Sequence, residues 1–179
     1  MRQQKIQLNN KLILTLFLIL IMSYISFAII ETKNISYASV EEAFDEILVR
    51  ENIERKDITD KAVRINDDDA VILFREGDLF AYSHFEKGFF GWKTDSFSIG
   101  EKSNGPSGTS NLIKGWIPDD YVFTTEKVLV NDKEAMILEL DKNNRAWVLV
   151  DSENEHQMDN INVRFIDENR NVINTLNKS

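Results

Sequence analysis

The sequence contains no cysteine among its 179 residues. Without cysteine the chain cannot form disulfides, carry a cysteine-linked lipid, use a thiol nucleophile or bind zinc through thiolates. Histidine is scarce as well, because only His84 and His156 are present, which are too few for a histidine-rich metal site. We therefore expect no cofactor, and the composition disfavours iron and zinc chemistry.

Acidic residues are absent from the first 30 positions, and basic residues are in the minority after them. Arg2, Lys5 and Lys11 precede Glu31, so the region from Glu31 onward retains 18 of the 21 basic groups against all 30 acidic ones, a net charge of −12. Because a phosphate backbone requires a basic surface, we expect no nucleic-acid partner. The same acidity disfavours contact between this region and anionic lipid headgroups.

Residues 12–30, with the sequence LILTLFLILIMSYISFAII, contain no charged side chain. A helix of this length is about 28 Å long, which matches a hydrocarbon core of roughly 30 Å. We predict a cytoplasmic tail at 1–11, a transmembrane helix at 12–30 and a polar tether at 31–38. Because the basic residues lie before the helix, the N-terminus is expected in the cytoplasm and the rest outside the cell, on a single-pass membrane protein.

The sequence SYAS at 36–39 leaves a second interpretation open, in which the apolar segment is a cleaved signal peptide. Ser36 and Ala38 are small residues at the two selective positions for cleavage after Ala38. Apolar regions of signal peptides usually run about 7 to 15 residues, shorter than the run found here, so we favour an uncleaved anchor. Both interpretations deliver residues 39–179 to the outside of the membrane.

Residues 39–179 have the pattern of one α+β domain. Ser39 and Glu42 form an S-x-x-E capping box, and an apolar stripe at helical spacing follows, which predicts an amphipathic helix at about 39–51. The stripe consists of Val40, Ala43, Phe44, Ile47 and Leu48. From Lys61 onward, short runs separated by turn residues predict a largely antiparallel β-meander sheet on which the helix packs. The expected strands lie near 61–66, 70–76, 79–85, 89–98, 112–117, 121–130, 134–140, 146–151, 161–166 and 171–175.

Glycine and proline are confined to one part of the chain, since all seven glycines and both prolines fall between Gly77 and Pro118. The segment GEKSNGPSGTSN at 100–111 is therefore predicted to be a flexible loop. It is a surface insertion, a divider between two hairpin systems, or a functional loop.

Aromatic residues are concentrated in the window 74–97, which holds eight of the chain's 18. Because alternate side chains of a strand share a face, Phe80, Tyr82 and His84 are expected to lie together. With a turn at the EKG sequence, 86–88, Phe90 and Trp92 are expected to pair with them across the hairpin.

This aromatic hairpin has two interpretations. In the first, one face of the hairpin is core under the amphipathic helix and the other packs on the C-terminal hairpins. In the second, Phe89, Phe90 and Trp92 contact a protein or cell-envelope partner, because exposed aromatic patches usually mark interaction sites. These three are our candidate binding residues.

The sequence NDDDA at 66–70 is the strongest candidate for a metal site. Three adjacent carboxylates repel one another unless a cation offsets their charge, so Asp67, Asp68 and Asp69 are candidate calcium ligands. The other acidic segments are expected to be solvated turns. Among them DENRN, at 167–171, lacks the glycine and the distant Glu of a calcium loop.

Motifs of nucleophilic catalysis are absent. The sequence has no G-x-S-x-G, no S-x-x-K followed by K-T-G, no H-E-x-x-H and no phosphate-binding glycine loop. His84 and His156 are expected to be structural or surface residues. We therefore expect a non-enzymatic, membrane-anchored extracytoplasmic domain with a binding or envelope-associated role. The alternative is a small secreted enzyme or enzyme inhibitor released after Ala38.

Four short motifs carry a loose resemblance to a known group: GFFGWK at 88–93, IKGWIPDD at 113–120, RAWVLV at 145–150 and VRFIDENRNVI at 163–173. With them the chain resembles small, uncharacterised single-pass extracytoplasmic proteins of Bacillus-type Gram-positive bacteria. The resemblance spans roughly 39–175 and implies location and fold, with no catalytic residues. This sequence departs from the group at Arg170, where such a hairpin turn usually has glycine.

Overall fold

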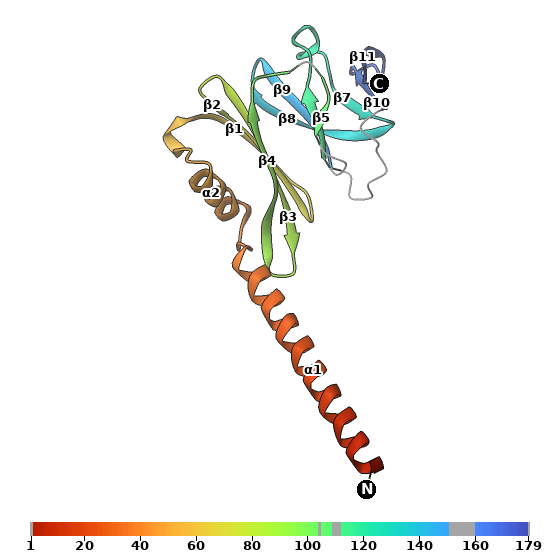
Figure 1. Ribbon diagram of the computed structural model, residues 1–179. Helices are drawn as coiled ribbons and strands as arrows, with labels where there is room; N and C mark the ends of the chain where they lie inside the picture. The colour runs from red at the N-terminus through yellow and green to blue at the C-terminus, as the bar shows by residue number, and fades with distance from the viewer. Residues whose placement is uncertain (1, 104, 109–111, 151–159, 179) are drawn as a thin grey trace.

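The computed structural model describes residues 2–103, 105–108, 112–150 and 160–178 (Figure 1). Helix α1 (Arg2–Asn34) projects away from the rest of the chain as a single long rod. Its segment Lys11–Asn34 is long and apolar enough to cross a membrane, and the apolar part of this segment is not buried against the rest of the chain. By length and composition this segment could be a membrane span or a signal sequence. The predicted tether is partly helical, because α1 continues to Asn34.

Helix α2 (Val40–Arg50) confirms the predicted amphipathic helix and its cap. The Glu42 backbone N–H donates to Ser39 Oγ at 3.2 Å, and Glu42 Oε2 accepts from the Ala38 N–H at 3.0 Å. The first bond satisfies an N–H group that the start of a helix leaves unpaired, and the second ties the residue before the cap to the first turn. All five residues of the predicted apolar stripe are buried.

The strands confirm the α+β class and its antiparallel pairing, but they form two sheets. The first sheet has the order β1-β2-β3-β4 and consists of β1 (Ile58–Ile65), β2 (Asp69–Glu76), β3 (Leu79–Gly88) and β4 (Gly91–Gly100). The second sheet has the order β11-β10-β7-β8-β9-β6-β5 and consists of β5 (Ser107–Gly108), β6 (Leu112–Trp116), β7 (Lys127–Val130), β8 (Lys133–Asp141), β9 (Asn144–Val150), β10 (Ile161–Ile166) and β11 (Val172–Lys178). The break between the sheets falls at the glycine-rich segment 100–111, as one of its three interpretations anticipates.

Two strand predictions differ from the structure. The strand expected at 121–130 begins only at Lys127, because a 3-10 turn, Asp119–Tyr121, comes first and the Thr125 hydroxyl donates to the Tyr121 carbonyl at 2.8 Å. Strand β5 lies inside the segment predicted to be a loop and pairs with β6. Two residues are too few to show a strand period in the sequence.

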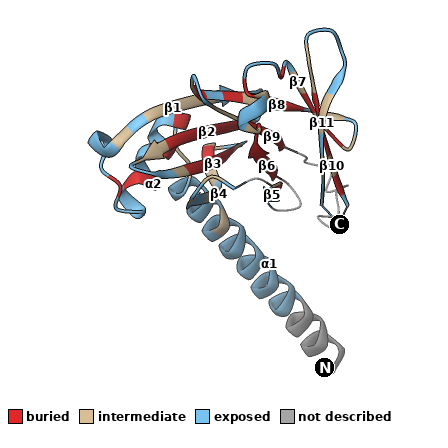
Figure 2. Ribbon diagram, turned by 90° about the horizontal axis from the view of Figure 1, so that it is seen from above, coloured by how far each residue is buried: buried red, intermediate tan, exposed pale blue. Residues whose placement is uncertain are grey.

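Three apolar clusters make up the core, and two of them lie on opposite faces of the first sheet. Figure 2 shows the buried residues along β2 and β3. The helix-side cluster lies between α2 and the first sheet and includes Phe44, Ile47, Ile72, Phe74, Phe85 and Trp92. The inter-sheet cluster includes Val71, Leu73, Tyr82, Leu112, Trp116, Leu138 and Val148. The third cluster lies within the second sheet and includes Ile113, Val128, Trp147, Val163 and Phe165. The first interpretation of the aromatic hairpin therefore describes most of its side chains.

The turn of this hairpin is not at 86–88. Gly88 pairs with Gly91, so Phe89 and Phe90 form the turn and Trp92 lies opposite Lys87. A turn at 86–88 would have placed Trp92 opposite Tyr82. Because side chains alternate along a strand, the change of register moves Trp92 to the other face, where it joins the helix-side cluster.

The segment after α1 is attached directly to the first sheet. Tyr37 and Trp92 exchange two backbone hydrogen bonds, each with an N···O distance of 2.8 Å. Gly91 permits this approach: its φ is +125°, and a Cβ there would lie 2.2 Å from the Tyr37 carbonyl oxygen. The folded domain therefore begins at Tyr37, three residues after α1 ends.

Candidate functional site

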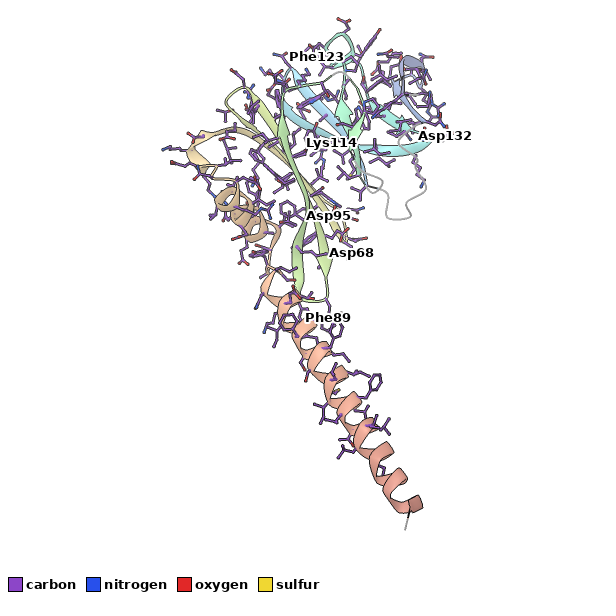
Figure 3. All side chains as sticks on the ribbon, in the orientation of Figure 1. Asp68, Phe89, Asp95, Lys114, Phe123 and Asp132 are labelled. Carbon is purple, nitrogen blue, oxygen red and sulfur yellow. The ribbon has the colours of Figure 1, made fainter. Side chains whose placement is uncertain are left out.

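The three candidate binding residues lie in different environments. Phe89, at the hairpin turn, is 95% exposed and contacts the Phe90 ring edge to face with centroids 5.1 Å apart. Phe90 is half-buried. Trp92 is only 8% exposed and packs in the helix-side cluster. Figure 3 shows Phe89 beside the upper turns of α1.

The candidate calcium ligands do not converge in the described part of the chain. Asp69 Oδ1 lies 2.9 Å from His84 Nε2, and the Asp68 carbonyl accepts from the Lys87 N–H at 2.8 Å. Across the described ranges, no group of three or more His, Cys, Asp or Glu side chains could hold a metal ion. A calcium site at Asp67, Asp68 and Asp69 therefore stays a prediction, because the described residues do not bring a set of ligands together there.

The DENRN segment forms a turn. Asp167 accepts hydrogen bonds from the backbone N–H of Asn171 at 2.7 Å and from its side-chain amide at 3.1 Å, and these bonds lower the pKa of the carboxyl. Arg170 adopts a φ of +67°, the conformation for which glycine is the usual residue. His156 lies outside the described residues.

A cleft lies between the two sheets, at the end of their interface where β3 and β4 face β6. We call it the inter-sheet cleft. Its volume is about 400 Å³, within the range of small-molecule sites. Residues of the connecting segment, among them Gly100, Ser103 and Ser107, form part of its wall. The segment that divides the strands into two sheets therefore also borders the space between them.

Lys114 is the charged centre of the cleft. It lies on β6 between Leu112 and Trp116, and alternation along the strand directs all three toward the first sheet. Lys114 Nζ lies 4.2 Å from the centroid of the Tyr82 ring and donates to Ser98 Oγ. Removal from water disfavours the ammonium form, so burial lowers the pKa of Lys114 to about 8.

Lys114 has no acidic partner among the described residues. Lys102 provides the contrast, because it also lies over an aromatic ring of the inter-sheet cluster, 5.5 Å from the Trp116 centroid. Its Nζ pairs with Asp119 Oδ1 at 2.5 Å. Each lysine therefore lies over an aromatic ring, Lys102 over Trp116 and Lys114 over Tyr82. Only Lys102 also forms an ion pair with a carboxylate.

Two buried hydroxyls of β3 also lack partners, on opposite faces of the strand: Tyr82 faces Lys114, whereas Ser83 lies between Ala81 and Phe85 of the helix-side cluster. Neither Tyr82 Oη nor Ser83 Oγ makes a hydrogen bond, although Tyr82 is 8% exposed and Ser83 is fully buried. Burial raises the pKa of Tyr82, so its phenol stays protonated and able to donate. Buried polar groups are nearly always paired, and an orphaned donor that lines a cleft is available to a ligand.

His84 lines the same cleft but is already engaged. Its Nδ1 lies 3.0 Å from Asp95 Oδ2 and its Nε2 lies 2.9 Å from Asp69 Oδ1. Both bonds form together only when protons lie on both ring nitrogens or on one of the carboxyl groups. His84 therefore joins β2, β3 and β4, which agrees with the structural role expected for it.

Glu101, Ser96 and Ser103 also line the cleft, and the rest of its wall is apolar. The Phe80 and Trp116 rings meet edge to face, with their centroids 4.6 Å apart, and Val71 and Leu112 extend this apolar surface. A cation, the unpaired Tyr82 hydroxyl and an aromatic wall together suit a ligand that has an anionic group and an apolar part.

The sequence contains a signal for this site, although Lys114 was not among the predicted site residues. In the run LIKGWI, 112–117, Lys114 is the single charged residue between buried apolar ones. A lone lysine on the core-facing side of a strand is uncommon, because lysine is almost never buried without a partner. Tyr82 was placed on the correct strand face, whereas Ser83 and Ser98 carried no sequence signal.

Comparisons with family models, with curated proteins and with solved structures gave no match. The assignment of a site therefore rests on the geometry of the cleft.

Proposed function

We propose that the chain is a membrane-anchored, extracytoplasmic binding domain, and that its inter-sheet cleft takes a small molecule with a carboxylate or phosphate group and an apolar part. The observation that carries this proposal is Lys114, a largely buried cation without an anion. A buried charge is costly unless it is paired, and an anionic ligand would supply the missing partner. The Tyr82 hydroxyl would donate to the same anionic group.

The anchored location is supported by the junction after α1. Cleavage after Ala38 would remove Tyr37, whose backbone pairs with Trp92 and whose ring packs against the helix-side cluster. The released domain would lose a contact for which Gly91 leaves room. An intact-mass measurement of the membrane fraction tests this location: we expect the full chain, and a mature protein beginning at Ser39 in the medium would contradict it.

Ligand binding is tested with octanoate, phenylacetate and inorganic phosphate on the full chain in detergent micelles. We expect the carboxylates to raise the melting temperature, whereas octanamide, which has no charge, leaves it unchanged. In Lys114→Met the methylene stem remains and the response to the carboxylates should disappear. Lys102→Met is the matched control, because Lys102 already has Asp119, and its response should equal that of the unmodified chain. Equal responses in both variants would contradict the proposal.

One contact favours a second candidate function, a serine hydrolase. A lysine with a pKa near 8 beside a serine hydroxyl is the arrangement of a serine–lysine pair, in which the neutral amine removes the hydroxyl proton. A fluorophosphonate probe distinguishes the two functions. Labelling that Ser98→Ala abolishes would establish the hydrolase, and carboxylate binding without labelling supports the binding domain.

A further inference from the structure

The tip of the β3–β4 hairpin carries an exposed aromatic pair that the inter-sheet cleft does not use. Phe89 is 95% exposed, the highest value among the exposed large apolar side chains of the described chain, and Phe90 lies against it. Elsewhere in the first sheet the aromatic side chains are buried in one of two clusters. An apolar pair at the end of a hairpin is not needed for folding and calls for an external partner.

The position of the tip relative to α1 identifies that partner. Trp92 is bonded to Tyr37, three residues after α1 ends, and the hairpin continues beyond this bridge toward α1 (Figure 1). Phe89 consequently lies beside the upper turns of α1 (Figure 3). Ile35, on the connection between α1 and Tyr37, is 55% exposed in the same region.

We propose that Phe89 and Phe90 insert into the outer interfacial layer of the same membrane that α1 spans. Aromatic side chains concentrate at that depth, where an apolar ring is removed from water while neighbouring polar groups stay hydrated. The inference rests on the anchored part of the proposed function and is independent of the cleft.

The charges around the tip are of both signs. The strand residues next to the turn are Glu86 and Lys87 on β3 and Lys93 on β4, and Lys93 pairs with Glu86 at 3.0 Å. Lys87 Nζ lies 5.7 Å from the Trp92 ring, and its backbone N–H donates to the Asp68 carbonyl, so the acidic turn 67–69 adjoins the tip. The insertion is therefore carried by the two rings and not by charge.

The covalent link to α1 makes weak insertion sufficient. A hairpin held beside a membrane helix meets the bilayer at a high effective concentration, so two rings can fix an orientation that they could not maintain in a free domain. Insertion would hold the domain at a fixed angle on the membrane, which determines the direction in which the cleft opens.

The absence of cysteine makes a direct test possible, because a single introduced cysteine gives a single label. We would attach an environment-sensitive fluorophore to Phe89→Cys in the full chain, reconstituted in vesicles of phosphatidylcholine and phosphatidylglycerol, and add lipids with a quencher near the headgroup. The matched control is Phe123→Cys, an exposed phenylalanine, 76% accessible, at the end of the molecule far from α1 (Figure 3). Ile19→Cys, within α1, reports whether the anchor itself is inserted.

We expect blue-shifted emission at position 89 and quenching several-fold greater than at position 123. The melting temperature of Phe89→Cys should match that of the unmodified chain, since the Phe89 side chain is almost fully exposed. Quenching at 19 with equal, low quenching at 89 and 123 would overturn the insertion of the tip and leave the anchor intact. Absence of quenching at 19 would overturn both the anchor and the inference.

Discussion

The two faces of the first sheet bury aromatic side chains in different ways. Toward α2, Phe44 and Phe74 meet edge to face at 5.3 Å, and Trp92 completes an apolar layer. Toward the second sheet, the aromatic rings lie around Lys114 and the Tyr82 hydroxyl. Lys114 has no acidic partner among the described residues, and the Tyr82 hydroxyl makes no hydrogen bond. Buried aromatics therefore stabilise the fold on both faces. The second face therefore also holds a cation and a phenol that the described residues leave without such partners.

The largest effect is expected on the α2 face, from Trp92→Ala. Removal of a buried tryptophan leaves a cavity and should lower the free energy of unfolding by about 3–5 kcal/mol. Urea unfolding of the full chain in micelles measures this loss. A change below about 1 kcal/mol would mean that Trp92 is not part of the core and would restore it as a binding residue.

The second largest effect is a pH dependence of the free energy of unfolding, which we expect from Lys114 on the cleft face. Burial lowers the pKa of Lys114 to about 8, whereas the unfolded value is 10.5. Between these values the unfolded chain binds more protons than the folded chain, so the free energy of unfolding should rise with pH, by at most about 3 kcal/mol. Below pH 8 both states are charged and the destabilisation is fully present.

Lys114→Met should remove this pH dependence, which makes the variant its control. Tyr82 limits the usable range, because burial raises the pKa of its phenol and its contribution to stability falls as pH rises above its unfolded value of 10.0. Urea unfolding of both chains is therefore compared between pH 8 and pH 10. Parallel curves would show that Lys114 is not held in a desolvated site.

Gly91→Ala should have an intermediate effect on the α2 face. A Cβ at this position would collide with the Tyr37 carbonyl, and the φ of +125° strains any side chain. We expect a loss of about 1–3 kcal/mol and faster amide exchange at Tyr37. Gly88→Ala is the control, because its Cβ would meet only the Gly91 carbonyl oxygen at an ordinary 3.7 Å. Equal exchange at Tyr37 in both variants would contradict a fixed junction.

The smallest effect on stability is expected for Phe89→Ser. Its side chain is almost fully exposed, so the free energy of unfolding in micelles should change by less than about 0.5 kcal/mol. Thermal unfolding against the unmodified chain measures this difference. A loss comparable to that of Trp92→Ala would place Phe89 in a packed environment and remove the case for membrane insertion.

The fold was largely predictable because its determinants are local. The capping box at Ser39, the stripe after it and the alternating runs of most strands can each be recognised within a few residues. The face occupied by Trp92 was mispredicted because it depends on whether the turn has two residues or three. A register error of one residue reverses every side chain of a strand.

The cleft was less predictable because it combines residues from both sheets. Lys114 on β6 meets Tyr82 on β3 and Ser98 on β4 only once the sheets have packed. The pairing of Asp69 with His84 likewise joins separate strands, and it accounts for one of the three carboxylates that suggested a metal site. Local patterns carry no information about such distant contacts.

The most direct test of the proposed ligand site is the stability of Lys114→Met at pH 7 without ligand. If Lys114 is a buried cation that awaits an anion, its replacement by an apolar side chain of similar length should leave the free energy of unfolding unchanged or raise it, by up to about 3 kcal/mol. If Lys114 instead stabilises the fold through Ser98 and the Tyr82 ring, the variant should lose about 1 kcal/mol or more. That loss would contradict the assignment of the cleft as a ligand site.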